Sequence, residues 1–171
     1  PYKGIAGAHD YRALVGRPDL LSFETAPFEA PYEIIGAVTG EFSVRATVPD
    51  FDLWMQLYDV APDGTAWNLS GHGAGLLRAS YREGGPGRSF VTAGQPLRLV
   101  LDRLHTANRF LPGHRLRLVI SAAFVPYFSV NPQTGEQEFD SVRNQPGSIE
   151  LLHSPDWPSR LLLPAVPIST E

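Results

Sequence analysis

The chain has 171 residues, of which 16 are glycine and 16 proline, and 43% of it is hydrophobic. So many helix-breaking residues exclude a helical bundle or coiled coil, and that hydrophobic content excludes intrinsic disorder. The formal net charge of −4 argues against binding to a nucleic-acid backbone. No apolar run approaches the roughly 18 residues that cross a membrane. We therefore expect a globular domain with neither a nucleic-acid nor a membrane partner.

The first part of the chain differs in pattern from the rest. Residues 1–18 are mixed in character, with a short helical turn predicted around 10–14, so we interpret them as a lead-in segment and residues 19–171 as the domain. The chain begins with Pro1 rather than Met. We expect a cytoplasmic location, and a start that is not native leaves export open.

Beyond residue 20, short apolar stretches alternate with turn signals, which is typical of an all-β sandwich or barrel. We predict about nine strands and no long helix. Segments 97–102 and 115–120 are apolar on both faces at their centres, so we expect them to be central strands. The other strands predicted from apolar alternation or position cover residues 42–48, 53–58, 148–152 and 160–163.

Glycine and proline mark the connections between these strands. Residues 62–64 and 112–113 are predicted to form tight turns, and residues 84–87 a flexible loop. A long loop is predicted over residues 131–147. Loops of that length inside a compact domain are often functional or mobile.

The sequence contains no recognisable catalytic site. The nucleophile of an α/β-hydrolase lies in a G-x-S-x-G turn, and the nearest approach, around Ser89, lacks the last glycine. Cysteine is absent, and no two of the five histidines have the spacing of a metal-ligand pair. We predict no catalytic residue in this chain and no cofactor.

Four aspartates, at positions 50, 52, 59 and 63, are the strongest metal candidate. Calcium binds several oxygen ligands that converge from loops, and Asp50 with Asp52 would supply two of them. An aspartate that follows a proline at the start of a strand more often caps a turn. We therefore expect no metal ion and keep calcium as an alternative.

Aromatic side chains suggest an interaction surface. The alternation of the predicted strands places several of them on one outer face of the sandwich, where contiguous apolar groups usually mark a partner. The proposed docking or ligand surface consists of Trp54, Tyr58, Trp67 and Tyr81. The alternative for Trp54 is that a long loop or a neighbouring domain covers it.

Several segments, in order, resemble one known family. These are 48–53 with 57–64, 77–82, 112–118, 124–128, 131–135, and 153–155 with 158–164. Their content and order resemble the C-terminal domain of the X-Pro dipeptidyl-peptidase and CocE/NonD serine hydrolases. The similarity runs over residues 9–168, almost the whole chain.

That resemblance implies a galactose-binding-like jelly-roll β-sandwich that packs on an α/β-hydrolase catalytic domain of the same parent protein. It places the catalytic triad upstream of this chain, in an enzyme that cleaves acyl esters or Xaa-Pro bonds. It also suggests that a loop carrying Tyr127 and Phe128 borders the substrate cleft. The alternative is a free-standing carbohydrate-binding or interaction module, and exposed strand edges would permit a homo-oligomer.

Overall fold

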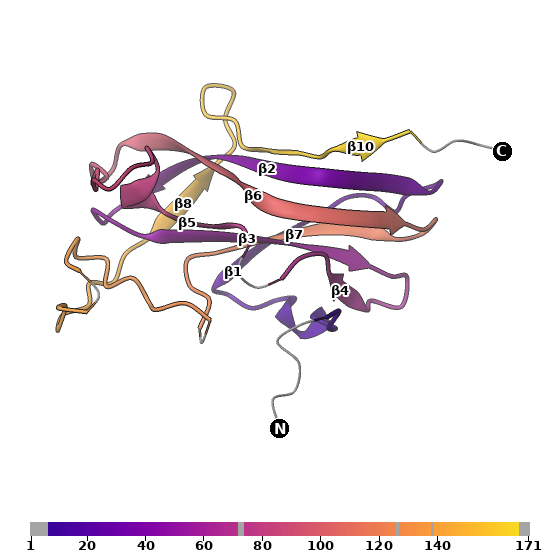
Figure 1. The fold of residues 1–171 in the computed structure, drawn as a ribbon, viewed down its shortest axis with the longest axis horizontal. Coiled ribbons are helices and arrows are strands. Elements are labelled where there is room, and N and C mark those ends of the chain that lie inside the picture. Colours follow the sequence, from indigo (N-terminus) through magenta and orange to yellow (C-terminus); the bar gives the residue numbers. More distant parts are fainter. Residues whose placement is uncertain (1–6, 72–73, 126, 138, 168–171) are drawn as a thin grey trace.

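The computed structural model describes residues 7–71, 74–125, 127–137 and 139–167, which form two antiparallel sheets packed face to face (Figure 1). Ten strands lie within these ranges. They are β1 (Leu20–Glu24), β2 (Tyr32–Ala46), β3 (Asp52–Val60), β4 (Ala66–Asn68), β5 (Leu76–Arg78), β6 (Pro96–Phe110), β7 (Arg115–Ser121), β8 (Ile149–Leu152), β9 (Arg160–Leu162) and β10 (Ala165–Val166). The predicted all-β sandwich is confirmed, and the jelly-roll and galactose-binding-like assignments stay predictions.

We call the two layers sheet A and sheet B. Sheet A has the order β1-β7-β3-β4, with β5 also paired to β3. In sheet B, β2 pairs with β6 on one side and with β8, β9 and β10 on the other. The apolar core fills the space between the layers, as the alternation in segments 42–48 and 53–58 predicted.

β2 and β6 are the two longest strands of sheet B and pair with each other. The hydrogen-bonded ladder between them shifts register between Val38 and Gly40. A side chain at Gly40 would collide with the Phe42 ring, which would lie 2.4 Å from an added Cβ. Only glycine fits this close approach. The sequence predicted only the last part of β2, and the structure extends that strand back to Tyr32.

The prediction of two central strands is half right. β7 lies between β1 and β3, as expected. β6 is instead an edge strand, paired in the described ladders with β2 alone. Its central Val100 is 47% exposed, whereas Val119 of β7 is 1% exposed beneath other parts of the chain.

The predicted turns are present, and the described part of the lead-in segment packs against the sandwich. Gly64 donates its backbone N–H to Ala61 across the turn between β3 and β4. The predicted helical turn is a 3-10 helix, η1 (Arg12–Leu14), and a second one, η2 (Ala79–Tyr81), follows β5. Asp10 bridges to Trp67 of β4, so residues 10–14 lie against sheet A. Residues 1–6 of the expected lead-in lie outside the described part.

Candidate functional site

Two aspartates flank Phe51 where the chain enters β3, and both are almost completely buried. The Asp50 carboxylate accepts hydrogen bonds from the backbone N–H of Phe51 (3.0 Å) and of Ser80 (2.9 Å). It also accepts one from the Ser80 hydroxyl (3.0 Å) and ion-pairs with Arg88 at 2.8 Å. A buried carboxylate is tolerated when its oxygens are satisfied in this way.

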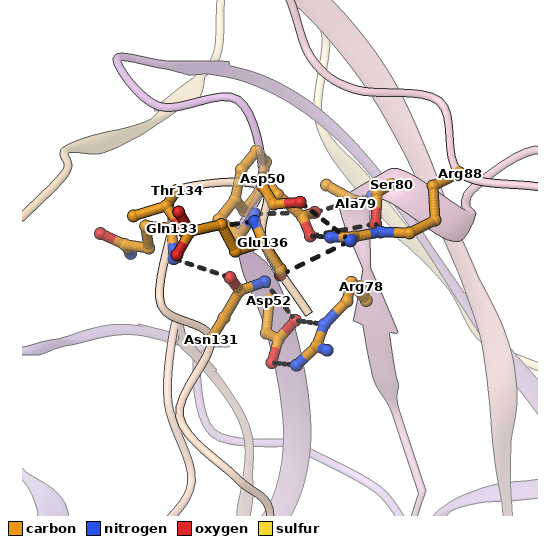
Figure 2. Close-up of polar contacts among 12 residues, drawn as sticks. Asp50, Asp52, Arg78, Ala79, Ser80, Arg88, Asn131, Gln133, Thr134 and Glu136 are labelled. Carbon is orange, nitrogen blue, oxygen red and sulfur yellow. Dashed lines mark hydrogen bonds and ion pairs between the residues drawn. The ribbon is translucent and has the colours of Figure 1, made fainter. Parts of the chain in front are cut away.

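Asp52 forms the second buried ion pair of the cluster (Figure 2). The Arg78 guanidinium donates two hydrogen bonds to the Asp52 carboxylate, from Nε at 2.7 Å and from Nη2 at 2.9 Å. This forked geometry is the strongest arrangement for an arginine and a carboxylate. The bond to Asp52 also raises the pKa of Arg78 above its ordinary value.

The two pairs hold the long loop at two separate points (Figure 2). Asn131 donates a hydrogen bond to Asp52 (3.1 Å) and accepts one from the backbone N–H of Gln133 (2.9 Å). Arg88 reaches the same loop by donating to the backbone carbonyl of Gly135 (2.9 Å). Side chains from three distant parts of the sequence therefore fix the base of the loop that follows residue 130.

Glycine and an aromatic ring complete this anchor. Gly135 has a φ of +82°, a backbone conformation that favours glycine. A side chain there would press on the Phe90 ring, 3.2 Å from an added Cβ. The Arg88 guanidinium lies over the same Phe90 ring, 4.8 Å from its centroid. A cation stacked on an aromatic face stabilises this junction further.

These contacts contradict the calcium alternative at Asp50 and Asp52. Each of the two carboxylates is paired with an arginine, which already supplies the positive charge. Over the part of the chain that the structure describes, no three histidine, aspartate or glutamate side chains gather as metal ligands would. The cluster anchors a loop, and the sequence missed it because Arg78, Arg88 and Asn131 show no common motif.

Beyond the anchored base, the loop exposes large apolar side chains. Phe139 is 83% exposed and Val142 is 95% exposed. Such exposure is unusual for apolar groups of this size on a loop whose base is fixed. We call the exposed apolar residues of the described connection between β7 and β8 the loop surface; they lie on both sides of the anchored base and are Val125, Tyr127, Val130, Phe139 and Val142.

The predicted surface of four aromatic residues is not assembled as expected. Trp54 and Tyr58 do point to the outer face of sheet A, but each is only 1% exposed. The Trp54 ring stacks on Phe124 with centroids 3.9 Å apart, and Tyr11 packs against Tyr58 at 5.3 Å. Residues 10–14 together with Phe124 and Phe128 thus cover this face, in agreement with the long-loop alternative for Trp54.

The other two residues of that surface are exposed but lie far apart. Trp67 pairs with Asp59 near the end of β3, whereas Tyr81 follows β5, whose Arg78 pairs with Asp52 at the start of β3. Seven residues of a strand span about 24 Å, so no single ligand platform includes both rings.

Burial raises the pKa of the Tyr58 hydroxyl well above its ordinary value.

The two residues predicted to border a cleft differ in exposure. Tyr127 is exposed, and its ring stacks on Phe124 with centroids 5.0 Å apart. Phe128 is half-buried and packs on the cluster that contains Trp54. Only Tyr127 contributes to the loop surface, while Phe128 fastens this part of the loop to sheet A.

Comparison with known proteins accounts for the combination of an all-β sandwich and the absence of a nucleophile motif. The model of the X-Pro dipeptidyl-peptidase C-terminal non-catalytic domain matches residues 2–162. The chain belongs to this family. Its sequence, like its sandwich, is that of the non-catalytic C-terminal domain of CocE/NonD-type hydrolases.

Relatives of this C-terminal domain are much longer than the chain. Cocaine esterase from Rhodococcus sp. is 30% identical over 167 residues, which are 96% of this chain and 29% of that protein. The structure of an α-amino acid ester hydrolase superposes with a TM-score of 0.86 and 29% identity, over 93% of this chain and 27% of that one. The chain therefore spans less than a third of these relatives.

A more distant structure supports the fold alone. An aminopeptidase from a marine sediment Thaumarchaeota archaeon has a TM-score of 0.86 at 20% identity, over 92% of this chain and 27% of that one.

Among the described residues, no helix has the length and apolar character to cross a membrane.

Proposed function

We propose that this X-Pro dipeptidyl-peptidase C-terminal domain serves as the accessory domain of a longer serine hydrolase that cleaves acyl esters. The names of a cocaine esterase and an α-amino acid ester hydrolase support ester substrates, and Xaa-Pro peptides are the alternative. The catalytic triad then belongs to an α/β-hydrolase domain upstream of this chain. The lack of a G-x-S-x-G motif in the sequence agrees with this division of labour.

The loop surface is the part of the chain that we propose to contact the catalytic domain. Phe139 and Val142 are almost fully exposed, although the base of their loop is held by two buried ion pairs. A fixed loop loses little conformational entropy on docking, so its apolar side chains contribute more of their burial to binding. This single observation carries the proposal.

We further propose that Tyr127 borders the substrate cleft of the assembled protein. Its ring stacks on Phe124, which itself lies on the buried Trp54, so the ring position is supported from below. An exposed aromatic ring on such a rigid support would form part of a cleft wall rather than a mobile cover. Tyr127→Ala is expected to raise the KM for an ester more than it lowers kcat.

Hydrolysis of a nitrophenyl ester by the longer protein tests the docking surface. Replacing Phe139 and Val142 together by serine should lower activity by about tenfold, because the domain then docks poorly. The control is Ile35→Ser, which removes another exposed apolar side chain, from the outer face of sheet B. Unchanged activity and stability in the double variant would contradict docking through this loop.

A complementary assay separates this function from the carbohydrate-binding alternative. The 171-residue chain alone is expected to hydrolyse no ester, whereas the longer protein does. Glycan binding by the chain, together with a complete gene product that hydrolyses no ester, would instead favour the interaction module. The buried positions of Trp54 and Tyr58 already remove half of the aromatic platform that a sugar would need.

A further inference from the structure

The edges of the two sheets are unequally protected against pairing with another chain. β6 carries charged residues along its length, and β4 and β5 have only 3 residues each. The opposite edge of sheet B is divided among β8, β9 and β10, with 4, 3 and 2 residues. Charges and short strands are the usual means of protecting an edge. β1 is the exception among the described strands.

β1 is an edge strand of 5 residues with the sequence Leu-Leu-Ser-Phe-Glu. It contains neither proline nor a basic residue. Leu21 is 44% exposed and Phe23 is 39% exposed, although both point toward the space between the sheets. They line two adjoining hollows of about 310 Å³ and 150 Å³, together with Ile120 and Leu151. The apolar interior is therefore open along this edge.

Hydrogen bonding determines which backbone groups of β1 are turned outward. Thr25, just after the strand, donates its N–H to Leu116 of the β7 side at 3.0 Å. Successive residues of a strand direct their backbone groups to alternate sides, so Phe23 and Leu21, two and four residues before Thr25, also direct their N–H and C=O groups to β7. Ser22 and Glu24 consequently direct their N–H and C=O groups away from sheet A, to the side where a strand of another molecule would pair.

We propose that a second copy of this chain pairs its β1 with this edge, antiparallel and across a two-fold axis at Ser22. Ser22 then lies opposite Ser22 of the other copy, and the two residues exchange both backbone hydrogen bonds. In the same register Leu21 lies opposite Phe23 of the second copy, and the reverse pair follows by symmetry. Both exposed apolar side chains become covered, and sheet A becomes continuous across the dimer.

The charges of β1 are compatible with this pairing. Glu24 already has partners in its own chain, since it ion-pairs with Arg117 at 2.7 Å and with Arg115 at 3.6 Å. In the proposed register it lies opposite Leu20 of the second copy, so no like charges face each other. Two strands of this length bury less area than a standard interface, so we expect a dimer that depends on concentration. This inference does not depend on the proposed hydrolase function.

A single introduced cysteine tests the two-fold axis directly, because the chain contains none. Residues opposite each other in a hydrogen-bonded pair have Cα atoms about 5.5 Å apart, within the range of a disulfide. Ser22→Cys should form a covalent dimer on mild oxidation, with twice the 18.7 kDa mass of the chain. The control is Val100→Cys on edge strand β6, which should stay monomeric. Absence of the covalent dimer in Ser22→Cys, or equal cross-linking in both variants, would overturn the proposal.

Sedimentation over a range of concentrations provides the second test. Ser22→Pro removes an outward N–H that β7 does not use, so it should raise the dimer dissociation constant about tenfold or more. Ser22→Lys places two like charges opposite each other and should have the same effect without changing the backbone. Ser22→Ala keeps the N–H and should dimerise like the parent. A chain that is monomeric throughout, or a dimer insensitive to both Ser22→Pro and Ser22→Lys, would refute the interface.

Discussion

The outer faces of the two sheets have opposite characters. On sheet A, residues 10–14 together with Phe124 and Phe128 cover the aromatic side chains of β3, so Trp54 and Tyr58 are buried. On sheet B, the outer face carries ion pairs between neighbouring strands, such as Arg45 with Glu150 and Glu41 with both Arg98 and Arg160. The sandwich therefore has two apolar layers in places, one between the sheets and a second, smaller one on the outer face of sheet A.

Trp54→Ala should produce the largest effect, because it removes the centre of that second core. The indole is buried and stacks on Phe124, so we expect the free energy of unfolding to fall by about 4 kcal/mol. Denaturant unfolding measures this change. Trp67→Ala is the control, since the Trp67 side chain is exposed, and a similar loss in both variants would contradict a covered outer face on sheet A.

Asp52→Ala should be nearly as disruptive, because it leaves the half-buried Arg78 guanidinium without its carboxylate and removes the acceptor of the Asn131 hydrogen bond. Removing one partner of a buried ion pair costs about 3 kcal/mol or more. Hydrogen exchange should also show earlier loss of protection in residues 131–136. The exposed Asp102 provides the control, and if Asp102→Ala lowered stability as much, the anchoring role of Asp52 would be wrong.

The covered face also predicts a dependence on alkaline pH. Burial raises the pKa of Tyr58 in the folded state, so its stabilising contribution is complete below the unfolded value of about 10. As the pH rises above that value, the unfolded state loses the proton first, and stability falls by about 1.4 kcal/mol per pH unit. Tyr58→Phe should remove this part of the decline. Parallel unfolding curves for the two proteins from pH 8 to pH 11 would disprove it.

The ion pairs of sheet B should give the smallest effect. Arg45 and Glu150 are both substantially exposed, and a double-mutant cycle with alanine should measure a coupling of about 0.5 kcal/mol. Added salt should reduce that coupling further. A coupling as large as the loss in Trp54→Ala would show that the two outer faces do not differ in the way described.

Sequence alternation predicted the inner core well, because each strand carries its own inward positions. It did not predict which outer faces are covered, since that depends on segments distant in sequence. Val100 and Val119 occupy equivalent places in similar apolar patterns, yet one is 47% exposed and the other 1%. The difference arises from Phe124, Phe128 and the lead-in segment, which pack over sheet A and not over sheet B.

The site could be predicted only in part, for a related reason. The family resemblance predicts Tyr127 at the border of a cleft, and this stays a prediction, because the structure shows only that the side chain is exposed. The residues that anchor the loop, Asp50, Arg88 and Asn131, come together only when β3 and the loop are in place. Their types and spacing form no local pattern, and an aspartate after a proline has the ordinary interpretation of a turn cap.

The pairing of β2 has a consequence for how this domain is made. The strands that pair with β2 in the described ladders are β6, β8, β9 and β10, and all of them begin at or beyond Pro96. A ribosome therefore releases the long β2 well before any of its partners has been synthesised. During that interval the strand exposes both its apolar face and its unpaired edges, a state that promotes aggregation. We expect productive folding to be delayed until synthesis has passed β6, so that translation speed and chaperones influence the yield of this domain.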